Sequence, residues 1–588
     1  MRKFTPILIA ALFVLLTSLP AWAQAVPDAL APDMIITNGK IMTVDEDFSY
    51  AEAVAVKDGK IVAVGAAKDI EALKGKATKV LDLKGNMLLP GINDSHLHLI
   101  SMVTGRPPYQ LDLSYPGVKS IEDMRAMIKD AVATLPEGAW IIGRGWNQGY
   151  IDELLADPNR KMNKSDFDDI SPNNPVYLVE YSYHNFVANS KALELAGITK
   201  DTPNPEGGII GKDPKTGEPT GVLQEKAFAL IEAVKPPHSR ETIIDALVNN
   251  VTYLTELGIT SVTTASENPE NINIFSEIAA RNDYPVRISV LLLWGEYGGL
   301  GGTLKDFQDA MKYVGTSTNF GSDKLRIAGV KLFADGIPPS MTAWSYEPYA
   351  DGSYGGLVTS GATDEARQQN LFDMIKFCHD QGYQVGVHAS GDRAMAVTVE
   401  AFVEAQKANP WDARHYTVHG DWVPVETMKL MAANNIGHTT QTAIKYDIAD
   451  DMTRLVGEER SGEQWPLKQM VDLGVKVANS SDAPVVPPDW RVGLQSSMLR
   501  EGKATGNVSG PHQRLSLEEG IRSYTIVPAW LDHAEDVKGS VEAGKFADFC
   551  IIGQDLTAID PHKIMEVPIL MTIMDGKVVY TDGTLAVK

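Results

Sequence analysis

The chain has 588 residues, 44% of them hydrophobic, which is enough to bury the core of a large domain and a smaller companion. This composition excludes a disordered protein. The formal net charge of −23 at pH 7 argues against nucleic acid and anionic membranes as partners, because both repel an acidic protein. Beyond this, the charge indicates only solubility.

The first residues of the sequence predict export. Arg2 and Lys3 precede an apolar stretch that ends at Ala21-Trp22-Ala23, a small-x-small cleavage pattern. We expect residues 1–23 to be a signal peptide, which would leave the mature chain periplasmic or secreted and free of the membrane. An uncleaved anchor helix is the alternative.

Two segments at opposite ends of the chain share one pattern. Residues 34–88 alternate apolar and polar positions between Gly/Asp turns, and residues 535–588 repeat this alternation. The NGK and DGK sequences at 38–40 and 58–60 are typical of hairpin turns. We therefore expect one small composite β-sandwich domain built from both ends.

The segment between them, 89–534, alternates strand and helix patterns and predicts an α/β fold, a TIM-type (β/α)8 barrel. Residues 101–230 contain further strands and Gly/Pro loops, which we interpret as an insertion after the first barrel strand, above the active face. The predicted barrel strands are LLPGINDSHLHL (88–99), GITSVTTAS (258–266), VRISVLLL (286–293), IAGVKLFAD (327–335), YQVGVHAS (383–390), HYTVHGD (415–421), IGHTTQT (436–442) and VKVANSSDAP (475–484).

The sequence has only two cysteines. Cys378 falls in a helical pattern and Cys550 in a strand pattern. We expect two separately buried thiols rather than a disulfide. Because there is no CxxC pair, a cysteine-built zinc site is excluded.

Polar side chains gather at the ends of the predicted barrel strands, where the catalytic groups of TIM barrels lie. His96 and His98 occupy alternate positions of one strand, so both imidazoles face the same side. The candidates are His96 and His98 in the first strand, Lys331 in the fourth, His388 in the fifth, His419 in the sixth and Asp482 in the eighth.

Each of these residues alone has an ordinary structural explanation, such as a hydrogen-bonded core histidine or a capping aspartate. Their joint convergence is hard to explain by packing, because every buried polar group needs a partner. A divalent cation supplies one partner for all of them. His-rich, thiol-free coordination favours zinc, ahead of iron, nickel, cobalt or manganese.

The sequence resembles the amidohydrolase superfamily of metal-dependent hydrolases, and within it amidohydrolase family 3. The motif PG-x-x-D-x-H-x-H appears at 90–98, with Asp94 before the two histidines. Four further family motifs are VKLFADG (330–336), HASGDRA (388–394), SSDAPV (480–485) and PTGVLQE (219–225), and the pattern H-x-x-x-x-N-S-x-A-L runs from His184 to Leu193.

The resemblance implies a ligand set. His96, His98 and Asp482 would hold a first metal ion, and His388 and His419 a second. Lys331 matches a lysine that many relatives carboxylate to bridge two metals, while a site with one ion stays open.

The resemblance also implies a mechanism in which water activated at the metal attacks a carbonyl and Asp482 shuttles the proton to the leaving nitrogen. His184 is a candidate hydrogen-bond donor to the oxyanion or substrate. The residues we expect around this site are Asp94, Asp392 and Arg393, which support the rim, and Trp146, Tyr181 and Gln441, which line the pocket or belong to the core.

We therefore expect an exported metal-dependent amidohydrolase that cleaves a C–N bond in an amide, an N-formyl or N-acyl compound, or a cyclic amide. The same site acting on an ester, lactone or phosphoester is the first alternative, and a non-catalytic metal- or solute-binding barrel is the second. The sequence lacks G-x-S-x-G, P-loop and dinucleotide-binding motifs, which argues against those enzyme classes. The expected partner is a small-molecule substrate, and a homodimer is compatible with the sequence.

Overall fold

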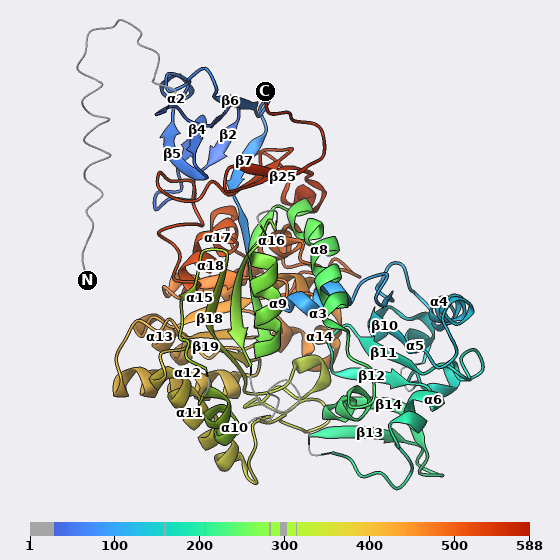
Figure 1. The fold of residues 1–588 in the computed structure, drawn as a ribbon. Helices are drawn as coiled ribbons and strands as arrows, with labels where there is room; N and C mark the ends of the chain where they lie inside the picture. Colours follow the sequence, from blue (N-terminus) through green and yellow to red (C-terminus); the bar gives the residue numbers. More distant parts are fainter. Residues whose placement is uncertain (1–28, 158–159, 206, 282–283, 294–302, 313) are drawn as a thin grey trace, which may run out of the picture.

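The computed structural model describes residues 29–588 except 158–159, 206, 282–283, 294–302 and 313. The predicted signal peptide lies outside the described residues. A small β-domain, a central barrel and a separate sheet beside the barrel can be followed in Figure 1. Within the described part of the chain, no helix combines the length and the apolar character needed to cross a membrane.

The central barrel confirms the predicted fold class. Among the described residues, eight strands follow one another in parallel pairing, in the order β22-β21-β20-β19-β18-β16-β15-β8. All eight coincide with the predicted segments. They are β8 (Ile92–Leu97), β15 (Ile259–Glu267), β16 (Arg287–Leu292), β18 (Leu325–Phe333), β19 (Gln384–Ala389), β20 (Tyr416–His419), β21 (Gly437–Thr440) and β22 (Val477–Asn479). The short β17 (Phe320–Gly321) pairs antiparallel with β18.

The barrel closes between β8 and the segment that follows β22. The main-chain N–H of Asp482 donates to the His96 carbonyl at 2.8 Å, and the N–H of His98 donates to the Ala483 carbonyl at 2.7 Å. This seam brings two candidate histidines next to the candidate aspartate.

Helices cover the outside of the barrel, and several begin at a polar residue that caps the helix N-terminus. Ser239, Asn268 and Thr363 each accept a hydrogen bond from the N–H of the third residue of their helix. The helices between barrel strands are α8 (Arg240–Glu256), α9 (Pro269–Ala279), α10 (Leu304–Met311), α11 (Asp364–Asp380), α12 (Asp392–Ala408), α13 (Val425–Ala433), α14 (Thr442–Gly462) and α15 (Leu467–Asp472). After β22 come α16 (Trp490–Leu499), α17 (Leu517–Ser523) and α18 (Ile526–Leu531).

A second sheet lies beside the barrel and is formed within the predicted insertion (Figure 1). Its strand order is β13-β14-β12-β11-β10-β9. These strands are β9 (Leu111–Asp112), β10 (Ile141–Trp146), β11 (Val176–Glu180), β12 (Asn185–Ala188), β13 (Gly208–Lys212) and β14 (Pro219–Glu225). The accompanying helices include α4 (Ile121–Thr134), α5 (Asp152–Ala156), α6 (Ser190–Leu195) and α7 (Ala229–Glu232), while α3 (Leu99–Thr104) packs in the barrel core beside α8.

Both ends of the chain contribute to the small β-domain, as the repeated sequence pattern predicts. One sheet has the order β5-β4-β1-β6 and the other β25-β24-β23-β7-β2-β3. Val54 and Leu81 of the first sheet share a buried core with Ile551 and Ile573 of the second. The strands are β1 (Met34–Thr37), β2 (Lys40–Met42), β3 (Tyr50–Ala51), β4 (Ala53–Lys57), β5 (Lys60–Gly65), β6 (Lys79–Asp82), β7 (Met87–Pro90), β23 (Phe549–Ile552), β24 (Ile569–Met574) and β25 (Lys577–Thr581).

One of the two predicted N-terminal hairpins is wrong. Asp58 and Gly59, with φ of 48° and 72°, join the antiparallel β4 and β5, as the DGK sequence predicts. At Asn38 and Gly39, however, β1 and β2 belong to different sheets. A Cβ at Gly39 would lie 2.5 Å from the Asn86 carbonyl oxygen, so this glycine permits close packing where the chain crosses between sheets.

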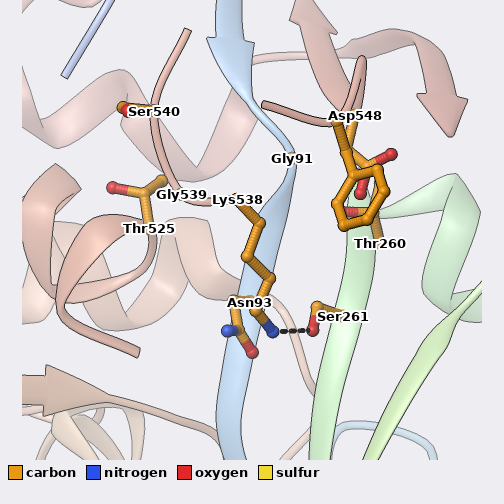
Figure 2. A pocket seen from close by; sticks show the side chains of 10 residues that line it. Gly91, Asn93, Thr260, Ser261, Thr525, Lys538, Gly539, Ser540 and Asp548 are labelled. Carbon is orange, nitrogen blue, oxygen red and sulfur yellow. Dashed lines mark hydrogen bonds between the residues drawn. The ribbon is translucent and has the colours of Figure 1, made fainter. Parts of the chain in front are cut away.

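A buried polar network fills the end of the barrel at which the strands begin, opposite the end where the strands finish. Figure 2 shows Lys538 between β8 and β15, with its hydrogen bond to Ser261. Lys538 Nζ also lies 2.5 Å from the Asp532 carboxylate, which in turn accepts from Asn93 and Thr263. The cavity lined by this network measures about 10 Å³, room for roughly one water molecule. It is therefore a structural floor rather than a ligand site.

Both cysteines are free and buried, which confirms the prediction of two separate thiols.

Candidate metal centre

Three of the predicted metal ligands come together at the barrel seam. His96 Nε2 lies 3.6 Å and His98 Nε2 3.3 Å from Asp482 Oδ1. A set of ligand atoms, one from each of these residues, lies within 4.8 Å of one another, close enough to bind one ion. His96 belongs to β8, His98 follows it directly, and Asp482 follows β22.

The chemistry of this cluster fits a divalent cation. His96 Nδ1 and Asp482 Oδ1 are buried without a hydrogen-bond partner among the described residues. Burial, together with the nearby Lys331, lowers the pKa of His96 well below its usual value. A neutral imidazole next to an unpartnered carboxylate oxygen is the donor set that metal ions bind.

Lys331 contacts this cluster from β18. Its Nζ donates to His96 Nε2 at 3.0 Å, and the side chain is buried. Burial lowers the pKa of Lys331 to about 7, so the amine is largely neutral above that pH.

His388 and His419 lie beside the first cluster, with ring centroids 4.3 Å apart, and the His419 ring lies 6.1 Å from that of His96. His388 Nε2 donates to the Gly336 carbonyl at 3.0 Å, and His419 Nδ1 donates to Gln441 Oε1 at 2.7 Å. Each ring is therefore held by one nitrogen, which leaves the other nitrogen as the candidate ligand atom.

The backbone is strained at two of these residues. His419 has φ of 76° and Asp482 has φ of 57°, the left-handed region that non-glycine residues rarely adopt. Strain of this kind persists where surrounding contacts impose it, and it is concentrated at functional sites. The left-handed backbone conformation interrupts the regular strand alternation at both residues.

Asp94 and Gln441 both hold site residues in place. Asp94 Oδ1 accepts from the main-chain N–H of His96 at 3.3 Å and of Ser481 at 3.2 Å, which ties the two sides of the seam together. Gln441 is buried, and its amide nitrogen donates to Ser480 at 2.9 Å while its oxygen holds His419. Its contacts thus place it behind the histidine.

Asp392 and Arg393 contact residues that follow β18 and are not among the predicted metal ligands. Asp392 Oδ1 accepts from the main-chain N–H of Tyr346 at 2.8 Å, and the Arg393 guanidinium lies 4.0 Å from the centre of the Trp344 ring. They brace the loop that follows β18.

Trp146 and Tyr181 belong to the insertion. Trp146 is buried at the end of β10 within an apolar cluster. Tyr181 lines a cavity of about 60 Å³ together with Asn185 and with Asp451 of α14. Because its walls come from both parts, this cavity lies between the insertion and the barrel rim.

His184 lies in the insertion and is held by a carboxylate. Its Nδ1 donates to Glu225 Oε2 at 2.8 Å. Burial acts to lower the pKa of His184, but the Glu225 and Asp482 charges help to raise it above its usual value. The geometry leaves Nε2 as the nitrogen available to a substrate.

Sequence reasoning did not single out three residues that the structure shows to be buried or bonded at the site. Asp335 accepts main-chain hydrogen bonds from Trp344, Ser390 and Gly391 at 2.8–2.9 Å. Glu225 holds His184, and Arg144 is buried beside Tyr181. Asp335 and Glu225 lie inside the quoted motifs VKLFADG and PTGVLQE, so motif membership was the available signal for these two, whereas Arg144 lies in none of the family motifs.

Comparison with known proteins gives the family. The model of the amidohydrolase family named Amidohydro_3 matches residues 79–580. The chain belongs to the amidohydrolase family. It is 30% identical to amidohydrolase YtcJ of Bacillus subtilis (strain 168) over 561 residues, covering 92% of this chain and 98% of the relative.

Other relatives of this amidohydrolase agree with the assignment. It is 26% identical to N-substituted formamide deformylase of Arthrobacter pascens, over 93% of this chain and 98% of the relative. The crystal structure of an uncharacterized metal-dependent hydrolase from Pyrococcus horikoshii OT3 shares its fold, with a TM-score of 0.69 at 23% identity, covering 90% of this chain and 99% of that one. Sequence and fold therefore agree that the protein belongs to the amidohydrolase family.

Proposed function

We propose that this amidohydrolase cleaves a C–N bond in an amide, an N-formyl or N-acyl compound, or a cyclic amide. The observation that carries the proposal is the Asp482 carboxylate, which lies next to two histidines at the barrel mouth and keeps one buried oxygen without a hydrogen-bond partner in the described chain. The similarity to an enzyme named N-substituted formamide deformylase supports this class of bond.

His96, His98 and Asp482 would hold the first ion, which we propose to be zinc, and His388 and His419 would hold a second. When bound, such an ion supplies a Lewis acid that polarises a carbonyl and lowers the pKa of water. Lys331 contacts His96, and we propose that its neutral amine adds carbon dioxide and loses a proton, which gives a carbamate that would help to hold the ions.

The protein's own groups then move the proton. Water adds its oxygen to the carbonyl carbon, and Asp482 takes the proton that the water loses. Asp482 passes this proton to the nitrogen as the C–N bond breaks, so that a carboxylic acid and an amine leave. His184 Nε2, oriented by the Glu225 bond at Nδ1, donates a hydrogen bond to the carbonyl oxygen as negative charge develops there.

Hydrolysis of an ester, lactone or phosphoester at the same site is the alternative, because metal-activated water is a tolerant nucleophile. A non-catalytic binding barrel is less favoured, since a binding protein has no use for a carboxylate placed to shuttle protons. The deciding experiment assays the zinc-loaded mature chain against matched N-formyl, N-acetyl, cyclic amide, ester and lactone substrates. We expect the C–N substrates to be cleaved fastest; faster cleavage of the oxygen esters, or no turnover of any substrate, would reject the proposal.

We also propose that the protein is exported after cleavage following Ala23. N-terminal sequencing of the protein recovered from the periplasm or medium tests this, with Gln24 expected as the first residue. A chain that still begins at Met1 in the membrane fraction would support an anchor helix instead.

A further inference from the structure

Arg144 is a buried cation at the end of β10 that the mechanism above does not use. Its side chain is only 3% exposed. Gly145, with φ of 97°, follows it, and the pairing of β10 with β11 shifts register between Arg144 and Trp146. Such bulges redirect side chains and are common next to active sites.

The guanidinium has few partners. One Nη donates to the Tyr181 carbonyl at 3.1 Å, and the Tyr183 ring centre lies 4.3 Å from the guanidinium carbon. Its Nε is buried without a hydrogen-bond partner, and no carboxylate of the described chain lies within 4.0 Å. Because a guanidinium stays protonated in proteins, this leaves a buried positive charge without a paired anion.

Arg144 contacts two segments that lead to residues of the proposed site. Its Cδ lies 3.8 Å from the position that a Cβ on Gly105 would take, at the end of α3, the helix that begins directly after His98. Its other partners, Tyr181 and Tyr183, precede His184 in the chain. Burial lowers the pKa of Arg144, while Tyr183, Asp482 and Asp112 act in the opposite direction.

We infer that Arg144 binds an anionic group of the substrate, and that the substrate of this amidohydrolase carries a carboxylate close to the scissile C–N bond. This inference rests on the proposed function, and it narrows the substrate class to N-acylated or N-formylated amino acids and related carboxylates. A guanidinium with its Nε unused presents a planar edge of N–H donors that matches a carboxylate.

A purely structural role explains the observations less well. Holding one carbonyl and one ring does not require a permanent charge, and burying an unpaired charge is costly. A divalent ion bound by Asp482 would add positive charge nearby and increase that cost. An anionic substrate relieves it.

The test compares two substrates that differ only in the carboxylate, N-formyl-phenylalanine and N-formyl-2-phenylethylamine, on the zinc-loaded mature chain. We expect the wild type to favour the carboxylate compound by about 10- to 100-fold in kcat/KM, the range of one charged hydrogen-bonded contact. Arg144→Met should remove most of this preference, and Arg144→Lys should restore part of it. Equal kcat/KM for both compounds in the wild type, or an unchanged preference in Arg144→Met, would overturn the inference.

A binding measurement separates this inference from the proposed function. Calorimetry with 3-phenylpropionate and its neutral analogue 3-phenylpropan-1-ol needs no turnover, because neither compound has a C–N bond to hydrolyse. We expect the wild type to bind the carboxylate more tightly and Arg144→Met to lose that advantage, even if neither formamide is hydrolysed. If formamides are hydrolysed but the carboxylate advantage is the same in both proteins, the reaction stands and Arg144 has no part in binding anions. If Arg144→Met fails to fold, two measurements still test the inference. They are the preference of the wild type for the carboxylate compound and the reduction of that preference in Arg144→Lys.

Discussion

His98, His388 and His419 share one arrangement. Each uses one ring nitrogen to donate to a fixed oxygen, of Ala265, Gly336 and Gln441 respectively. This bond selects the tautomer and the ring orientation, so the other nitrogen is presented without further adjustment. The ordering of the site therefore depends on groups that never touch an ion.

We predict that Asp482→Asn lowers kcat by about 10²- to 10⁴-fold, because the amide cannot accept the proton that the carboxylate takes. Metal content, measured by mass spectrometry of the digested protein, should largely persist because the amide oxygen remains a ligand. The matched control is Asp245→Asn on the exposed face of α8, which should leave kcat unchanged. Substantial turnover in Asp482→Asn would show that another group shuttles the proton.

Gln441→Leu removes the acceptor that orients His419 and should weaken metal binding by about 10- to 100-fold. Gln441→Glu keeps an oxygen at the same reach and should retain most of the affinity. Competition with a chromophoric chelator measures both. Equal affinities in the Leu variant and the wild type would mean that His419 does not bind the metal.

The elements that carry these residues are joined at the barrel floor as well as at its mouth. Asp532 follows α18, yet its carboxylate binds Lys538 and side chains on β8 and β15. Burial acts to raise the pKa of Asp532, but Lys538 and Arg326 outweigh it, and the pKa lies below its usual value. The network thus links the first two barrel strands to the segment entering the small β-domain.

Lys538→Met should lower the free energy of unfolding by about 3–5 kcal/mol, because it leaves the buried Asp532 carboxylate without its main partner. In the wild type, the lowered pKa of Asp532 contributes stability above its unfolded value of about 4, and this is lost as pH falls through the folded pKa. In the variant, the unpaired carboxylate has a raised pKa, so its deficit should be largest at neutral pH and shrink toward pH 4. Urea unfolding across this pH range measures the difference, and a pH-independent deficit would point to lost packing instead.

At the level of the whole molecule, one chain combines a barrel, an inserted sheet and a two-ended β-domain. The metal centre lies at the seam where the first strand meets the segment after the last, so ligands 386 positions apart in the sequence, His96 and Asp482, become neighbours. A bound ion would therefore hold the barrel closed.

Removal of metal with a chelator should abolish activity and also lower the unfolding temperature by several degrees, because an ion that binds only the folded chain stabilises it. Re-addition of zinc should restore both properties. The number of ions per chain, measured at saturation, distinguishes one-metal and two-metal centres. An unchanged unfolding temperature after complete metal removal would show that the seam does not depend on the ion.

Much of this molecule follows from local pattern. Alternation and helical periodicity gave the eight barrel strands, because side-chain burial sets those periods. The strand-end positions of Lys331, His388 and Asp482 indicated a shared site, because parallel barrel strands end at one face. The turn at Asn38-Gly39 was misjudged, since a turn sequence does not say which sheet the next strand joins.

The sequence by itself determined the fold class, the family resemblance and the set of polar residues at the barrel mouth. The reason is that the period of each strand, and the order of the strand segments along the chain, can be read from local sequence. Only the tertiary structure decided which atoms meet: Lys331 with His96, Gln441 with His419, Glu225 with His184. It also showed which atoms lack a hydrogen-bond partner in the described chain, above all Arg144 Nε and Asp482 Oδ1. Partnership depends on residues far apart in sequence, so no local pattern encodes it.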